Sequence, residues 1–161
     1  MVTYFYRKFN MGEKKMNAVS TDKLENELSE ISDISDYINN NSGNFVSEKL
    51  SDHLNRLLGA KDMSVADVVA ASGLNKGYVY QIFEGSKEKP SRDKLIAIAM
   101  GMKLNFGDTQ KLLKIACMRP LYAKDKHDAI IIFALKKRKN IDFINEKFEE
   151  YGYKALSGEV K

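Results

Sequence analysis

Residues 64–85, with the sequence SVADVVAASGLNKGYVYQIFEG, constrain the fold more than any other segment of the chain. The hydroxyl of Ser64 can cap a helix by accepting a hydrogen bond from a free backbone amide. Three valines then recur on one face of that helix: Val65, Val68 and Val69. Gly73 follows where the chain must leave the helix sharply, and the left-handed conformation required there costs glycine little. The segment therefore begins with a short, capped amphipathic helix.

A second short helix follows this turn. Leu74 can pack into the corner, and Asn75 can cap the new helix. Its apolar side chains have the spacing i, i+3, i+4 and form one stripe: Val79, Ile82 and Phe83. Helices this short are marginal in isolation, so both must pack on a shared core. The segment predicts a helix-turn-helix whose second helix keeps one face free.

Composition limits what the rest of the chain can be. A length of 161 residues allows about one domain and an appendage. The single cysteine, Cys117, excludes an internal disulfide and fits a reducing compartment. The longest apolar run, residues 129–135, is too short to span a bilayer, and residues 1–9 lack the features of a secretory signal. We therefore expect a cytoplasmic protein that does not bind membranes.

Charge is unevenly distributed along the chain. Residues 17–44 contain one lysine and six acidic residues, whereas residues 45–161 contain 21 basic and 15 acidic residues. A basic body behind an acidic leader suits a polyanionic partner, although ordinary variation of a solvated surface explains the same numbers.

The periodicity predicts an all-α protein, because apolar residues recur at helical spacing and no alternating β-type runs occur. We expect helices over residues 22–38, 46–58, 65–72, 76–84, 92–101, 107–117, 125–137 and 142–151. The predicted organisation is a leader over residues 1–44, a helix-turn-helix domain over 45–121 and a packed helical hairpin over 122–161. We expect residues 39–44 (NNNSGN) to be a flexible linker. Residues 1–15 are expected to be poorly ordered and precede an alternative start at Met16.

The predicted leader helix is acidic but has an apolar stripe, formed by Leu24, Leu28, Ile31, Ile34, Tyr37 and Ile38. Two interpretations remain open. The stripe can dock on the body while the acidic side chains face water, or the leader can compete with a nucleic acid for the basic face.

Residues 92–121 align with residues 127–156 at an offset of 35. Five pairs are identical: Asp93/Asp128, Ile96/Ile131, Ala99/Ala134, Asn105/Asn140 and Leu121/Leu156. Each copy predicts a helix, a polar turn with asparagine and a second helix. Either the second hairpin is a repeat that extends the core, or two amphipathic hairpins align by chance. Residues 129–135 are apolar on all sides, which predicts a helix covered on several faces, as a core helix or a dimer seam.

The free face of helix 76–84 carries the side chains that we expect to contact bases: Asn75, Lys76, Gly77, Tyr80 and Gln81. Glutamine can pair with adenine through two hydrogen bonds, lysine can meet guanine or a phosphate, and tyrosine can contact a thymine methyl group. Glycine leaves space for a base edge. The alternative for each residue alone is a solvated helix face.

A second group of residues is expected to contact phosphates. It includes hydroxyl groups near helix starts and the cations of the segment GSKEKPSRDKL: Ser64, Tyr78, Lys87, Lys89, Ser91, Arg92 and Lys94. Such contacts fix the position of a protein on a duplex but do not read its sequence.

These residues resemble the helix-turn-helix family of Cro and phage repressors, also called the XRE family. The resemblance rests on Gly73-Leu74-Asn75, Val79, Ile82, Gly85, Pro90-Ser91 and the apolar residues of 95–99, and it covers about residues 46–117. It implies a five-helix, lambda-repressor-like bundle that binds operator DNA, often as a dimer. We therefore expect a sequence-specific regulator that binds double-stranded DNA as a homodimer.

Other chemistry has little support in the sequence. Only two histidines occur, His53 and His127, and neither has a cysteine or a carboxylate pair at metal-ligand spacing. Phosphate loops and nucleophile motifs are missing, so we expect no enzyme activity, cofactor or small-molecule substrate. The turn 136–139 (KKRK) is either a further phosphate contact or a solvated turn. The alternative function is a module that binds another protein through the same bundle.

Overall fold

The computed structural model describes residues 19–45 and 48–157. Every regular element in these ranges is a helix, which confirms the predicted all-α class. The chain divides into two compact units, residues 1–47 and residues 48–161. None of the helices in the described ranges is long and apolar enough to cross a membrane.

In residues 19–45 of the first unit the chain forms two helices, α1 (Thr21–Glu30) and α2 (Ile34–Asn40), where one helix over residues 22–38 was predicted. That prediction is wrong because the backbone becomes extended at Ile31 and Asp33. The Asp33 carboxylate then accepts a hydrogen bond from the Ser35 amide at 2.8 Å and caps α2. Short polar side chains such as Asp compete with the backbone of a continuous helix in this way.

The predicted linker over residues 39–44 is folded onto the first unit. Asn41 is buried, and its amide donates a hydrogen bond to Glu27 Oε1 at 3.0 Å. Asn44 in turn donates to Asn41 Oδ1 at 2.8 Å. These polar residues therefore hold α2 against α1 rather than forming a free tether. Residues 1–15 and the alternative start at Met16 lie outside the described residues.

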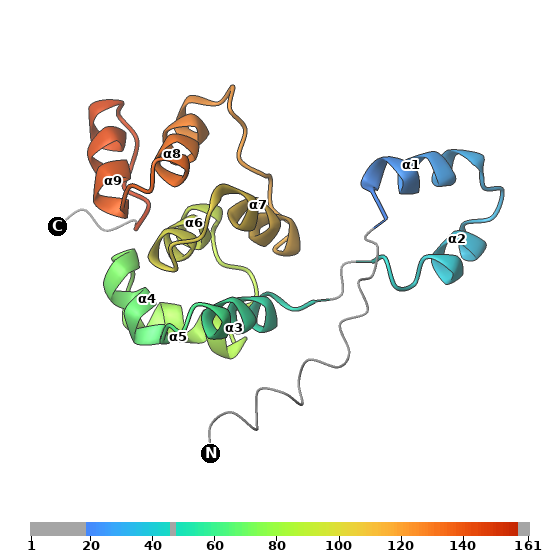
Figure 1. The fold of residues 1–161 in the computed structure, drawn as a ribbon, viewed down its shortest axis with the longest axis horizontal. Coiled ribbons are helices and arrows are strands. Elements are labelled where there is room, and N and C mark those ends of the chain that lie inside the picture. Colours follow the sequence, from blue (N-terminus) through green and yellow to red (C-terminus); the bar gives the residue numbers. More distant parts are fainter. Residues whose placement is uncertain (1–18, 46–47, 158–161) are drawn as a thin grey trace, which may run out of the picture. The chain divides into compact units, whose positions relative to one another are not determined.

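Within residues 48–157, the described part of the second unit, three pairs of helices are each joined by a short turn, and one additional helix lies between the first two pairs in the sequence (Figure 1). The pairs are α3 (Leu50–Ala60) with α4 (Val65–Ser72), α6 (Arg92–Gly101) with α7 (Phe106–Ile115), and α8 (Lys126–Lys136) with α9 (Ile141–Glu150); the last two pairs pack as hairpins. The additional helix is α5 (Lys76–Glu84), which packs against α3 and α4. Five helices, α3 to α7, thus fall in the segment predicted as a five-helix bundle.

The turns that join the three helix pairs have the same backbone geometry. In each turn one residue has a left-handed backbone: Asp62, Lys103 or Arg138, with φ of 52–54°. The amide of that residue donates to the carbonyl three residues earlier, and the next amide donates to the carbonyl five residues earlier. This pair of hydrogen bonds closes the end of the first helix. The following residue, Ser64, Asn105 or Asn140, caps the second helix with its side-chain oxygen.

The structure confirms two matching hairpins at the predicted offset of 35 residues. Moving the bounds of α7 forward by 35 residues gives the bounds of α9. A long-range contact is repeated as well. Gln110 Oε1 accepts a hydrogen bond from the Leu121 amide at 2.7 Å, and Asn145 Oδ1 accepts one from the Leu156 amide at 3.0 Å. The same side-chain position therefore anchors the chain that leaves each hairpin.

The core lies around α6, in which every residue from Leu95 to Gly101 is buried. At Gly101 a side chain would meet Ser72 Cβ and the Val68 carbonyl at 3.1 Å, so glycine permits the close packing of α4 on α6. The hairpin α8/α9 belongs to the same core through residues such as Ile131 and Phe148.

The apolar helix over residues 129–135 is covered less completely than expected. Ile131, Ala134 and Leu135 are buried, whereas the Phe133 side chain is 48% exposed. Phe133 stacks on Phe143 of α9, with ring centroids 5.8 Å apart. One side of α8 is therefore a core face, and the opposite side faces outward.

Candidate nucleic-acid interface

The position of α5 is set at both of its ends. Gly73, with φ of 68°, ends α4, and Asn75 Oδ1 then accepts a hydrogen bond from the Tyr78 amide at 3.3 Å. At the other end Gly85 has φ of 84°. A side chain at either glycine would be strained by this backbone, which is why the two turns need glycine.

The two faces of α5 have different environments. Val79, Ile82 and Phe83 are buried at 0%, 1% and 5% exposure, as the predicted stripe requires. Four of the five expected base-contacting residues are exposed, namely Asn75, Lys76, Gly77 and Gln81, and the fifth, Tyr80, is half-buried. The structure brings all five together at the start and along the outer side of one helix. We call this group the outer row of α5.

Aromatic rings hold several of the nearby lysines. Lys94 Nζ lies 4.3 Å from the centre of the Tyr78 ring, and Lys87 Nζ lies 5.2 Å from it. Lys76 Nζ lies 5.7 Å from the ring of Tyr80. Attraction between an ammonium group and a ring face restricts the lysine without neutralising its charge. The cations therefore remain available to an anion.

Tyr78 belongs to α5 but not to the outer row, and its side chain is half-buried. Burial raises the pKa of its phenol, although a hydrogen bond with the Ser91 backbone offsets part of the effect. The phenol is consequently protonated at neutral pH and can donate a hydrogen bond.

Ser64 and Ser91 act as helix caps. Ser64 Oγ accepts from the Asp67 amide at 3.2 Å, and Asp67 accepts from the Ser64 amide at 2.8 Å, which lowers the pKa of the Asp67 carboxyl. Ser91 Oγ accepts from the Lys94 amide at 3.4 Å. Both serines are exposed and keep a hydroxyl proton that can be donated to a phosphate.

Arg92 has a different environment from the neighbouring lysines. Its guanidinium group donates to both carboxylate oxygens of Asp128, at 2.8 and 2.9 Å, and to the carbonyls of Arg119 and Pro120. Only 19% of the Arg92 side chain is exposed, and Asp128 is fully buried. Arg92, which was predicted to contact a phosphate, instead forms an internal ion pair that joins α6 to α8. Arg92 is therefore not part of the proposed interface.

Asp128 also belongs to a possible cation-binding group with Asp125 and His127, whose ligand atoms lie within 4.8 Å of one another. Burial raises the pKa of Asp128, but hydrogen bonds from Arg92 and from the Tyr122 amide lower it by more, so the net pKa is below 3.8. Because the Arg92 guanidinium already covers both carboxylate oxygens, the group does not fit a metal ion.

The charges around the outer row favour an anionic partner. The outer row contains Lys76, and the following segment of the sequence contains Lys87, Lys89 and Lys94, together with the acidic residues Glu84 and Glu88. Within residues 19–45 and 48–157 none of these four lysines forms an ion pair. The lysines of this region are therefore not neutralised by direct contacts in the described parts of the chain.

Comparison of the chain with protein-family models, with curated proteins and with solved structures found no match.

Proposed function

We propose that this protein is a sequence-specific regulator that binds double-stranded DNA through α5, in the manner of the Cro and phage-repressor family. The observation that supports this proposal most strongly is the outer row of α5, in which four of five residues are exposed, on a helix whose other face is buried. A short helix fixed by caps at both ends is suited to insertion into a major groove.

Base recognition is assigned to the outer row. The Gln81 side chain is exposed and can donate to and accept from adenine at the same time. Gly77 lies one turn earlier and leaves room for a base edge beside it. Lys76 and Asn75 lie at the start of α5, where they can reach a neighbouring base pair.

Phosphate binding is assigned to residues on both sides of α5. Ser64 begins α4, and Ser91 begins α6. In the region of Ser91, the phenol of Tyr78 is a further donor. Three lysines of the same region supply cations, namely Lys87, Lys89 and Lys94. Such contacts supply affinity that is independent of sequence and decreases as salt rises.

We further propose that two copies act together as a symmetric dimer. A symmetric pair of α5 helices would read two half-sites separated by about 10 base pairs or a multiple of that distance. Palindromic symmetry in the preferred DNA is the consequence that tests this part of the proposal.

Selection of bound duplexes from a random library by the full chain tests binding, specificity and symmetry together. We expect an enriched, palindromic site of defined sequence. Recovery of duplexes with no common sequence, at low and at high salt, would contradict sequence-specific recognition by α5.

A protein-binding module is the second candidate function, and exposed apolar side chains favour it. Phe133 and Tyr151 in the second unit are 48% and 57% exposed, and Ile34 in the first unit is 57% exposed. Salt separates the two functions, because phosphate contacts weaken steeply as salt rises, whereas an apolar protein interface does not.

A further inference from the structure

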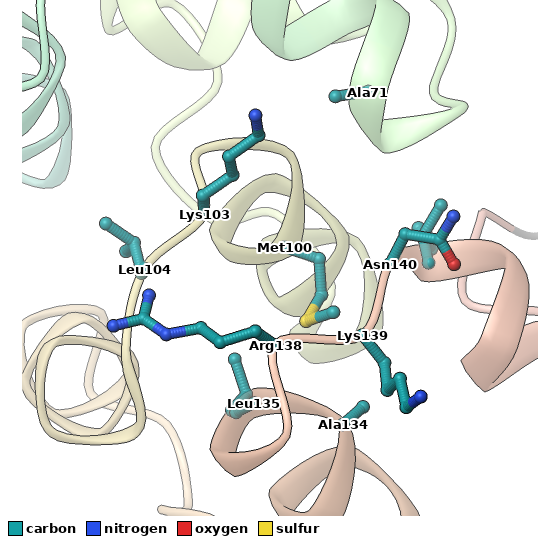
Figure 2. Close-up of a pocket in the computed structure, with 10 residues that line it drawn as sticks. Ala71, Met100, Lys103, Leu104, Ala134, Leu135, Arg138, Lys139 and Asn140 are labelled. Carbon is teal, nitrogen blue, oxygen red and sulfur yellow. The ribbon is translucent and has the colours of Figure 1, made fainter.

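We propose that a cavity lined by α4, α6, α8 and the start of α9 binds a small organic anion with a compact apolar body. The cavity has a volume of about 220 Å³ and lies where the ends of α4, α6 and α8 meet the start of α9 (Figure 2). It is separate from the outer row of α5. Pockets for drug-sized ligands span roughly 300–1,000 Å³, so this cavity fits a smaller molecule.

The floor of the cavity is apolar. Met100, Leu104, Ala134 and Leu135 line it, and each of these side chains is at most 8% exposed. Figure 2 shows Met100 near the middle of this group, with the backbone of the α8/α9 turn passing beside it. A ligand that covers this floor gains from the removal of apolar surface from water.

The rim of the cavity is cationic. Lys103, Arg138 and Lys139 line it, and none of the ten lining residues is acidic. Within the described parts of the chain these three side chains have no ion-pair partner. The Lys61 ammonium adds a further positive charge nearby, because it donates to the Lys103 carbonyl at 3.2 Å. Positive charge around an apolar floor selects an anion with an apolar body.

The repetition of the hairpins explains why two cationic residues line the same cavity. Lys103 and Arg138 are equivalent residues of the two copies, 35 positions apart, and both have the left-handed conformation with φ of 54°. Each therefore occupies the same place in its turn. Because α6 packs on α9 and α8 on α7, both residues line one cavity.

A ligand in this cavity would also touch the helix-turn-helix segment. Ala71 of α4 lines the cavity and lies two residues before Gly73, where the chain turns toward α5. The ligand would join α4 to the start of α9, and so would favour one arrangement of α4 relative to the C-terminal hairpin. Any effect on DNA affinity rests on the proposed function, whereas binding of the anion does not.

Calorimetric titration of the full chain without DNA tests the proposal. The probes are benzoate, uncharged benzamide of the same shape, and acetate, which lacks the apolar body. We expect saturable binding of benzoate. Benzamide and acetate should each bind with an affinity at least about tenfold lower. Equal binding of benzoate and benzamide, or no saturable binding of benzoate, would overturn the proposal.

Matched variants locate the site. Arg138→Met removes a cation that lines the cavity, and we expect it to weaken benzoate binding by about fivefold. Lys137→Met removes the neighbouring exposed cation of the same turn, which does not line the cavity, and should leave binding unchanged. Equal losses in the two variants would show an unspecific charge effect and overturn the assignment.

A third variant tests the cavity itself. Ala71→Phe keeps every cation of the cavity rim but places a large ring in the cavity. Ala71 is an exposed position of α4, so the substitution should not disturb the core. We expect loss of benzoate binding with an unchanged melting temperature of the protein. Retained binding in a folded Ala71→Phe variant would place the ligand elsewhere. If this variant fails to fold, the comparison of Arg138→Met with Lys137→Met still decides the question.

Discussion

Helices α5 and α6 follow each other along the chain and have similar lengths, but the protein uses them differently. In α6 every residue from Leu95 to Gly101 is buried, so other parts of the protein pack against this helix on all sides. In α5 three residues are buried, and four of the five residues of the outer row are exposed. The fold therefore depends on the identity of side chains all around α6, but only on one side of α5. Polar residues on the free side of α5 are available for binding.

The strongest test of the packing around α6 is the substitution Asp128→Ala. It removes the partner of the Arg92 guanidinium and leaves that charge without a counter-ion at a site that is only 19% exposed. We expect the free energy of unfolding to fall by about 3 kcal/mol. Chemical denaturation measures it, with Asp142→Ala in the exposed first turn of α9 as the control. Equal effects of the two substitutions would show that the ion pair does not hold α8 to α6.

The same carboxylate predicts a dependence on pH. Because the pKa of Asp128 is lower in the folded protein than its ordinary value of 3.8, its contribution is complete above that value. The contribution decreases as the pH falls through the folded pKa. The difference in unfolding free energy between the wild type and Asp128→Ala should therefore be constant near neutral pH and shrink below pH 3.8. A difference that grows in acid would contradict the direction of this shift.

The core positions of the two copies give the next test. Ile96 and Ile131 are equivalent, and both are fully buried. Replacing either with alanine should cost about 2–5 kcal/mol, through lost burial and the cavity left behind. If both hairpins belong to one cooperative core, denaturation of either variant remains a single transition. A separate transition for Ile131→Ala would show that α8/α9 unfolds independently.

Smaller effects are expected at the equivalent caps. Asn105 Oδ1 accepts a hydrogen bond from the Asp108 amide at 2.8 Å, and Asn140 Oδ1 accepts one from the Phe143 amide at 3.1 Å. Alanine at either position should cost about 1 kcal/mol of unfolding free energy. A loss at Asn105 without a loss at Asn140 would show that the shared turn geometry does not bring shared energetics.

Much of the scaffold was predictable from the sequence because its signals are local. The bounds 65–72, 76–84 and 92–101 agree with the structure. Each of these helices begins after a side chain that caps it, namely Ser64, Asn75 or Ser91. The repeat was visible for the same reason, since turns and caps recur at fixed spacing.

Two features that the sequence did not reveal depend on distant partners, and a third was hidden by a competing local pattern. Arg92 lies among lysines in the sequence, but its partner Asp128 is 36 residues away, and no local pattern shows the pairing. The break between α1 and α2 follows from a local cap at Asp33, which the regular apolar stripe concealed. The cavity beside Lys103 and Arg138 exists only because two hairpins pack together.

Substitutions at the proposed DNA-contacting residues should change DNA affinity and leave the stability of the fold nearly unchanged. Lys94→Ala should weaken binding to all duplexes alike, and Gln81→Ala should weaken it only at one base position. Neither substitution is expected to change the free energy of unfolding by more than about 0.5 kcal/mol, because Gln81 is exposed and Lys94 is only half-buried.

The most direct measurement compares the affinity of the wild type and of Gln81→Ala for the selected duplex and for a scrambled duplex at one salt concentration. The account predicts a loss of about 1–3 kcal/mol on the selected duplex and little change on the scrambled one. Equal losses on both duplexes, or no binding of either duplex by the wild type, would contradict the assignment of α5 as the helix that reads DNA.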